Sequence, residues 1–444
     1  MFLRYTRAAV YRLRSLRSLI HSALLLAGLA AMACGLPGSS RPERIVLIVV
    51  DTLRSDHLSV YGSEVQTPNI DALAARGQVF ENLLASFHQT SMSMAAMFTG
   101  RTPSIESGDP TKPLPWNSST WCGLVRFASG EPGETCIPRA VPTLAEHLRE
   151  AGYRTIGVAS NQFLYEPSGF GRGFDDWTEV DRRKPVAGPR SRKGISDPAR
   201  SRYWRVVNRA VFEALDRGPP ERTFLYVHYI DVHDHLFFMK RSYAESVVLM
   251  DRAIGRLLEG LEERGFLEDA VVILTSDHGE RLGEDHDFPG DFPGSRGHYG
   301  NPSFDELLRV PLIVAPPVFE DTSRFLRTQD VFYLVQQVAG LVPERASDTR
   351  PSELFVGEIL FRTYRKDRWK STLRRSDGRA FLFDLETDPE ERHDLSQEKR
   401  LVVFSHRTRL NQLTQELQAQ GVSQTELSEE DKERLRILGY LDDE

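Results

Sequence analysis

Ile45-Val-Leu-Ile-Val-Val50 is a run of six apolar residues, most of them β-branched, that ends at Asp51. A strand that is apolar on both faces belongs inside a parallel sheet covered by helices. Similar runs recur at residues 223–228, 270–276 and 310–315, with helical patterns between them. Strands that alternate with helices predict a doubly wound, mostly parallel α/β sheet.

Two helices between these strands carry explicit signals. Thr143-Leu-Ala-Glu146 has the spacing of a capping box, and Gly152 stands where that helix should stop. Apolar residues recur at helical spacing from residue 243 to residue 261. We therefore expect one helix after residue 143 and a longer one over residues 243–261.

Acidic and histidine side chains follow the ends of three predicted strands. Parallel strands end at one edge of a sheet, and ligands bind beyond that edge in open α/β folds. The sequence therefore predicts a functional site there. The residues concerned are Asp51, His228, Asp231, His233, Asp277 and His278.

The last hundred residues differ in character from the rest. Residues 369–373 and 380–383 flank Asp377-Gly378, which is a hairpin signal. Residues 428–438, stopped by Gly439, predict a short helix. With 444 residues, the chain can form a main domain over 44–344 and a small C-terminal subdomain of antiparallel sheet plus helix over 345–444. Residues 182–205, rich in charged and turn-forming residues, predict a solvated insertion.

The N-terminus has the features of an export signal. Residues 1–17 hold five arginines and no acidic residue, and a mostly apolar run follows over 19–33. The small residues that end this run suit a cut site, and the run is shorter than the about 20 residues of a membrane span. We expect residues 1–34 to be a signal peptide and 35–43 a linker, with an uncleaved anchor as the alternative. Cys34 after Ala-Met-Ala also resembles a lipoprotein box, so lipidation at Cys34 stays open.

Charge and cysteine usage agree with an exported protein. The net charge of −7 argues against nucleic acid as the main partner. Cys122 and Cys136 are the two cysteines beyond the signal, and both lie in a Gly/Pro-rich segment. In an oxidising compartment we expect them to form a disulfide. The predicted location is the periplasm, or the membrane surface as an anchored bacterial lipoprotein.

Metal chemistry is the simplest use of the predicted site. Asp51, Asp277 and His278 supply two carboxylates and an imidazole, a mixture that favours Zn²⁺ or Mn²⁺ over Ca²⁺. The segment 87–100 predicts a loop that becomes a helix near Thr90. The positive end of the helix dipole lies at that helix start and favours the ionised form of a hydroxyl there. A bound metal would also lower the pKa of the hydroxyl. Thr90 is thus a candidate nucleophile, with Ser91 and Ser93 as alternatives.

An ordered series of motifs resembles the sulfatase family of the alkaline phosphatase superfamily over roughly residues 44–444. The segments that carry the resemblance are Asp51-Thr-Leu-Arg54-Ser-Asp56-His57, Tyr61-Gly62, Thr67-Pro68-Asn69-Ile-Asp71, Phe98-Thr99-Gly100-Arg101, His228-Tyr-Ile-Asp231-Val-His233, Thr275-Ser-Asp277-His278-Gly279-Glu280, Gly297-His298, Glu306-Leu-Leu-Arg309-Val-Pro311, Leu382-Phe-Asp384-Leu-Glu-Thr-Asp388-Pro389 and Leu435-Arg-Ile-Leu438-Gly439-Tyr440.

The resemblance implies roles for individual residues. It implies one divalent metal on Asp51, Thr90, Asp277 and His278, and it leaves a second metal open. His233 and His298 fall on positions that hold the ester oxygens or protonate the leaving group. The candidates for substrate binding are His228, Asp231 and Arg101. The implied partner is an anionic ester, with a glycan or a lipid headgroup as candidates.

The chain also departs from the family pattern. Sulfatases of the formylglycine type have a Cys/Ser-x-Pro-x-Arg motif, and the three defined positions are here Thr90, Met92 and Met94. Threonine cannot become a formylglycine, so the usual sulfatase nucleophile is absent. Thr90 with Asp277-His278 instead resembles phosphodiesterases and phosphoethanolamine or glycerolphosphate transferases of the same superfamily.

Two functions follow from these motifs and departures. The leading one is a metal-dependent hydrolase or transferase of sulfate or phosphate esters, with Thr90 as nucleophile. The alternative is a non-catalytic binding lipoprotein on a degenerate sulfatase scaffold, suggested by the methionines at 92 and 94. Metal content separates the two, because a degenerate scaffold has little reason to retain the Asp/His site.

Overall fold

The protein is described by a computed structural model. It describes residues 42–101, 136–137, 139, 141–180, 203–218, 222–235, 241–284, 286, 297–298, 301–341, 353–357 and 360–418. The predicted signal peptide with Cys34, Cys122, the helix over 428–438 and most of the 182–205 insertion lie outside these residues. Within the described residues, no helix is long and apolar enough to span a membrane.

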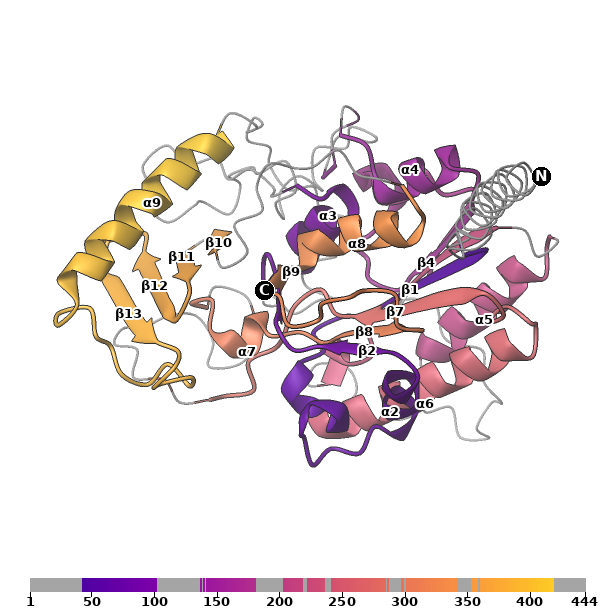
Figure 1. Cartoon of the computed structure of the whole chain (residues 1–444), viewed down its shortest axis with the longest axis horizontal. Helices are drawn as coiled ribbons and strands as arrows, with labels where there is room; N and C mark the ends of the chain where they lie inside the picture. Colours follow the sequence, from indigo (N-terminus) through magenta and orange to yellow (C-terminus); the bar gives the residue numbers. More distant parts are fainter. Residues whose placement is uncertain are drawn as a thin grey trace, which may run out of the picture. The chain divides into compact units, whose positions relative to one another are not determined.

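The main sheet has seven strands in the order β2-β8-β7-β1-β6-β4-β5 (Figure 1). The central strand β1 pairs in parallel with β6 on one side and β7 on the other, and β4 and β5 extend the parallel part. The strands are β1 (Arg44–Val50), β2 (Gln78–Phe80), β4 (Arg154–Ala159), β5 (Asp176–Glu179), β6 (Thr223–Tyr229), β7 (Ala270–Thr275) and β8 (Leu312–Ala315). A two-stranded sheet pairs β3 (Leu83–Leu84) with β9 (Leu326–Arg327).

The doubly wound, mostly parallel fold expected from the sequence is confirmed. One correction concerns residues 310–315, because β8 runs antiparallel to β7. Among the described residues between β7 and β8, the only helix is the short α7 (Asp305–Leu308). Leu307 O of α7 accepts the Gly279 N–H near the carboxyl end of β7, so β8 starts from that same edge and runs antiparallel.

Helices cover both faces of the sheet because the side chains of β1 alternate between two cores. Ile45, Leu47 and Val49 pack in the core with α3, α4 and α8, whereas Val46, Ile48 and Val50 pack in the core with α2, α5 and α6. Figure 1 shows these two helical layers. The helices are α2 (Pro68–Ala75), α3 (Thr90–Thr99), α4 (Leu144–Glu150), α5 (Tyr203–Leu215), α6 (Tyr243–Glu262) and α8 (Val331–Val338).

The predicted helix signals act as expected. Thr143 and Glu146 form a reciprocal capping box at the start of α4, and Gly152 adopts a positive φ of 87° just after that helix. The long helix expected over 243–261 is α6. A second capping box, between Ser242 and Glu245, fixes its start. Residues 203–205, expected in the solvated insertion, instead form the first turn of α5, where Tyr203 is buried.

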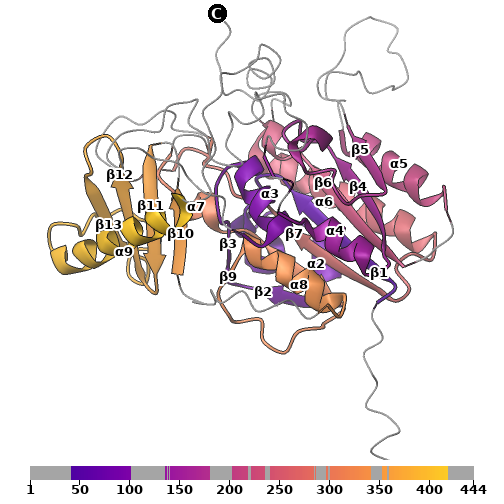
Figure 2. The same ribbon diagram turned by 90° about the horizontal axis from the view of Figure 1, so that it is seen from above.

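The C-terminal part forms a separate antiparallel sheet in the order β10-β11-β12-β13 (Figure 2). The hairpin expected around Asp377-Gly378 joins β12 to β13. A helix that the sequence did not reveal, α9, packs on this sheet through Leu410, which is completely buried. The elements are β10 (Glu353–Gly357), β11 (Phe361–Lys366), β12 (Trp369–Arg374), β13 (Ala380–Asp384) and α9 (Arg400–Gln418).

Candidate metal centre and active site

The carboxyl ends of β1, β6 and β7 bring three predicted residues together. In the register of the sheet, Val49 pairs with both His228 and Thr275, so Asp51 and Asp277 follow neighbouring strands at the same level. Ligand atoms of Asp51, His228 and Asp277 all lie within 4.8 Å of one another, and the three residues are buried. His228, expected to bind substrate, thus belongs to the carboxylate cluster itself.

His278 and Thr90 complete this first cluster. His278 Nε2 lies 3.5 Å from Asp277 Oδ2, 4.0 Å from Asp51 Oδ1 and 3.2 Å from Thr90 Oγ1. Its Nδ1 donates to Gly279 O at 2.8 Å, which leaves Nε2 as the acceptor that faces the cluster. Thr90 is the first residue of α3, as the sequence indicated, and it is buried.

The first cluster contains buried ligand atoms that a metal ion could bind. Asp51 Oδ1, Asp277 Oδ2 and both ring nitrogens of His228 are buried and have no hydrogen-bond partner. Burial, and then the nearby Asp277 carboxylate, raise the pKa of Asp51 well above its ordinary value. Buried like charges at this distance need a cation to offset them. Two carboxylates, two imidazoles and a hydroxyl fit Zn²⁺ or Mn²⁺ better than Ca²⁺.

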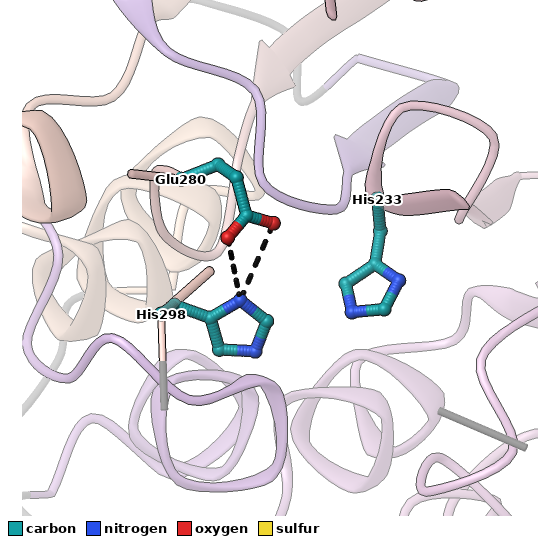
Figure 3. A group of neighbouring side chains, drawn as sticks. All are labelled: His233, Glu280 and His298. Atoms are coloured by element: carbon teal, nitrogen blue, oxygen red, sulfur yellow. Dashed lines mark hydrogen bonds and ion pairs between the residues drawn. The ribbon is translucent and has the colours of Figure 1, made fainter. Parts of the chain in front are cut away.

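A second group of buried side chains adjoins the first (Figure 3). Ligand atoms of His233, Glu280 and His298 lie within 4.8 Å of one another, and His298 Nδ1 lies 3.2 Å from Glu280 Oε1. The rings of His298 and His278 are 4.4 Å apart, so the two groups are neighbours. The predicted pair His233 and His298 is therefore brought together beside the first cluster.

The two histidines of the second group have opposite electrostatic surroundings. Burial disfavours the charged form of His233, but its hydrogen bond to Asp234 and the nearby Asp51 outweigh burial and raise its pKa to about 9. Burial, followed by the proximity of His278 and His233, lowers the pKa of His298 well below its ordinary value. His233 thus favours the protonated state and His298 favours the neutral state.

A turn with strained backbone geometry follows β1 and positions the loop that contains Asp51. Thr52 has a φ of 58°, which is unusual for a β-branched residue. Its N–H donates to Asp277 Oδ1 at 3.1 Å, and its carbonyl accepts from Tyr243 Oη at 2.6 Å. These bonds from two other elements hold the strained residue and link the two carboxylate loops.

Asn161 is a site residue that sequence reasoning missed. Its Nδ2 donates to Asp51 Oδ2 at 2.7 Å and lies 3.5 Å from Thr90 Oγ1, and its Oδ1 accepts the Phe163 N–H at 2.9 Å. The bond from Phe163 fixes the amide with its NH₂ group toward the cluster. Asn161 follows β4, whose apolar residues 156–159 are a strand signal that was overlooked. Glu280 was also missed, although it stands in the Asp277-His278-Gly279-Glu280 motif.

Three other expectations have different outcomes. Asp231 belongs to neither group, and its Oδ1 accepts the Trp204 N–H at the start of α5. Arg101 is exposed and follows the far end of α3, which places it roughly 15 Å along the helix from Thr90. Neither substrate-binding candidate is therefore brought into the two groups.

Cys136 is buried and disulfide-bonded, while its expected partner Cys122 lies outside the described residues.

Replacing Asn161 with alanine should lower kcat by about 100-fold, as the loss of one preorganised donor does in other enzymes. The reason is that Asp51 and Thr90 both lose the same fixed N–H donor. Steady-state kinetics would measure the change. Asn208→Ala is the matched control, because Asn208 is an equally buried amide that bonds Ala253 and Tyr229. Equal kinetic losses in both variants would contradict a role for Asn161 in the site.

Comparison with known proteins identifies relatives of the whole arrangement. The sulfatase family model matches residues 43–340. Human N-acetylgalactosamine-6-sulfatase is 27% identical over 282 residues, which cover 56% of this chain and 52% of the human protein. The chain thus spans about half the length of the curated relatives that it matches.

Solved structures agree at the level of the fold. A 2-O GAG sulfatase superposes with a TM-score of 0.62 at 16% identity, covering 85% of this chain and 93% of the other. The phosphonate monoester hydrolase of Agrobacterium radiobacter superposes with a TM-score of 0.58 at 17% identity, covering 88% and 99%. Both cover the main sheet and the C-terminal part, so the two-part architecture is shared.

Proposed function

The chain belongs to the sulfatase family, within the alkaline phosphatase superfamily, and from this premise we propose that it is a metal-dependent hydrolase or transferase of phosphate or sulfate esters with Thr90 as nucleophile. One observation carries the proposal. The Thr90 hydroxyl lies at the start of α3, 3.2 Å from His278 Nε2, beside buried carboxylates whose outer oxygens have no hydrogen-bond partner.

The metal would be held by Asp51, Asp277, His278 and Thr90, with His228 as a further ligand. A bound divalent ion supplies positive charge that neutralises the carboxylates and lowers the pKa of a neighbouring hydroxyl. The first turn of α3 adds backbone N–H groups and a positive dipole end, both of which favour an anionic ester. Asn161 Nδ2 lies 3.5 Å from Thr90 Oγ1 and would stabilise the negative charge that this oxygen gains when it loses its proton.

The reaction would proceed by two displacements. Thr90 gives up its hydroxyl proton to the solvent, and the bond from its Oγ1 to phosphorus or sulfur forms while the bond to the leaving oxygen breaks. His233, which favours the protonated state, gives its proton to the leaving oxygen. Water or an alcohol then attacks the central atom and loses its proton to the same histidine, while the bond from the central atom to Thr90 Oγ1 breaks. Thr90 Oγ1 then takes back a proton from the solvent. Glu280 orients His298 beside the reacting group.

Phosphate esters are the better substrates for this nucleophile. A threonyl ester has no route like that of hydrated formylglycine, which ejects sulfate without attack at sulfur. It must therefore be broken at its central atom, and phosphoryl groups accept such a displacement readily in metal sites. Met92 and Met94, at the positions of the formylglycine motif, are buried in the apolar core and add no polar group to the site.

We place the enzyme outside the cytoplasm on the strength of its N-terminal sequence, with a lipid anchor at Cys34 as an open addition. The human relative and the 2-O GAG sulfatase are named as sulfatases of sugars. The Agrobacterium protein is named as a hydrolase of phosphonate monoesters. We therefore propose an anionic ester of a glycan or a lipid headgroup as substrate. The intact set of metal-competent side chains supports an enzyme rather than a degenerate binding protein.

A substrate panel tests the proposal directly. The purified protein is assayed against matched aryl phosphates, phosphodiesters and sulfates, each with Zn²⁺, Mn²⁺ or Ca²⁺. We expect turnover of a phosphate ester with Zn²⁺ or Mn²⁺ and its loss after chelation. Sulfate hydrolysis without any phosphate hydrolysis would overturn the substrate argument. No turnover together with no bound metal would favour the binding protein.

A further inference from the structure

The short helix α7 and the residue after it bond to three of the four segments that carry the first cluster. Its last carbonyls have no partners within the helix and can accept from other segments. Leu307 O accepts the Gly279 N–H at 2.8 Å, and Leu308 O accepts the Ala85 N–H at 2.7 Å. The carbonyl of Arg309, the residue after α7, accepts the Ser55 N–H at 3.3 Å. Gly279 directly follows His278, while the other two amides lie in the segments that contain Thr90 and Asp51.

The contact between α7 and Gly279 is especially close. A β-carbon on Gly279 would lie 2.0 Å from the carbonyl oxygen of Glu306. Only glycine lets the Asp277-His278 loop approach α7 this closely. The position of α7 therefore determines the position of His278, whose own Nδ1 bonds to the Gly279 carbonyl.

The start of α7 is held by the C-terminal sheet. Lys370 on β12 has a fully buried side chain, and its Nζ donates to Asp305 Oδ1 at 2.9 Å and to Glu391 Oε2 at 3.0 Å. Glu391 in turn accepts the backbone N–H of Asp305 at 2.7 Å. Figures 1 and 2 both show α7 between the two sheets. Arg365 on β11 also pairs with Asp305, with Nη1 3.2 Å from Oδ2. His286 adds a further link, from Glu306 to the carbonyl of Glu390.

We propose that Lys370 is a positioning residue for the active site, which acts through Asp305 and α7 on the loops that carry Asp51, Thr90 and His278. The C-terminal sheet is thereby part of the catalytic apparatus without touching the reacting atoms. The physical reason is that a buried ammonium bonded to two carboxylates has one low-energy arrangement, so it fixes α7 in direction as well as in place. The proposal rests on the proposed function only for its effect on turnover.

Hydrogen exchange at backbone amides tests the proposal without substrate or metal. The double variant Lys370→Met/Glu391→Gln removes the cation and one carboxylate together, so the remaining charge is balanced better than in Lys370→Met alone. In the double variant we expect exchange to be at least about tenfold faster at the amides of Gly279, Ala85 and Ser55. If the wild type turns over an ester, kcat should fall about tenfold or more, while KM changes much less.

Arg368→Met, in the turn between β11 and β12, is the control in the same subdomain. Arg368 forms ion pairs with Asp384 and Glu386 that do not involve α7, so exchange at the three amides should stay as in the wild type. Unchanged protection in the folded double variant, or the same loss in Arg368→Met, would overturn the proposal. So would a double variant that fails to fold while Arg368→Met folds, because the network would then act on the fold as a whole. Failure of the proposed function alone would leave the exchange result intact.

Discussion

Replacing Thr90 with alanine is expected to lower turnover by roughly four orders of magnitude or more, the scale seen when a covalent nucleophile is removed. The substitution deletes a hydroxyl and a methyl group at the first position of α3, and the helix keeps its N-cap residue Gln89. The fold should therefore persist while the attacking oxygen is lost. Single-turnover and steady-state assays on the best ester from the panel would measure the effect.

Two further variants make this result specific. Thr90→Ser should keep part of the activity, because it retains the hydroxyl at the same place. Thr99→Ala removes the same atoms from the other end of α3, where the hydroxyl donates to Ala95 O, and it should leave turnover nearly unchanged. If Thr90→Ala kept most of the wild-type rate, the nucleophile would have to be Ser91, Ser93 or a metal-bound water. Ser93 is the weaker of the two serines, because its hydroxyl already donates to Asp277 O at 2.6 Å.

Replacing Asp277 with alanine is expected to weaken metal binding by more than about 100-fold, the upper end of what even indirect partners of a metal site contribute. Asp277 Oδ2 is one of the buried oxygens without a partner, while Oδ1 accepts the N–H groups of Thr52 and His278. The variant thus loses a ligand and also loosens the turn at Thr52. Elemental analysis after dialysis, followed by titration with Zn²⁺ and Mn²⁺, would measure the loss.

Asp251→Ala separates metal binding from simple destabilisation. Asp251 is also a buried carboxylate that accepts two backbone N–H groups, from Asn69 and Ile70 at the start of α2, but it belongs to neither candidate metal group. Its loss should lower the free energy of unfolding and leave the metal content of the folded protein as in the wild type. Equal metal content in Asp277→Ala and the wild type would refute the assignment of Asp277 as a ligand.

The sequence was informative wherever a local pattern reports a long-range arrangement. Continuous apolar runs indicate strands buried on both faces, and the geometry of parallel sheets then brings their ends together, so Asp51, His228 and Asp277 could be grouped without coordinates. Thr90 could be placed at a helix start because the pattern changes there. The direction of β8 could not be predicted in this way, because an apolar run is the same in parallel and antiparallel strands.

Asn161 and Lys370 mark the limit of such reasoning. Asn161 reaches Asp51 from 110 positions away along the chain, and an asparagine after a short strand is most often a turn residue. Lys370 stands in an antiparallel strand, where lysine is ordinarily a solvent-facing residue. Its burial depends on Asp305 and Glu391, which only the tertiary structure brings to it. Contacts of this kind leave no periodic pattern in the sequence.

The strand order of the main sheet also constrains when the first cluster can form during synthesis of the chain. Arg44 at the start of β1 pairs with Thr223 of β6 and Ala270 of β7, so the central strand has neither of these neighbours until about half of the 444 residues have been synthesised. Contacts so distant in sequence form late and slowly. A growing chain that lacks β7 has neither Asp277 nor His278, and the first cluster is then incomplete. The first cluster can therefore be complete only after the chain has been synthesised through His278.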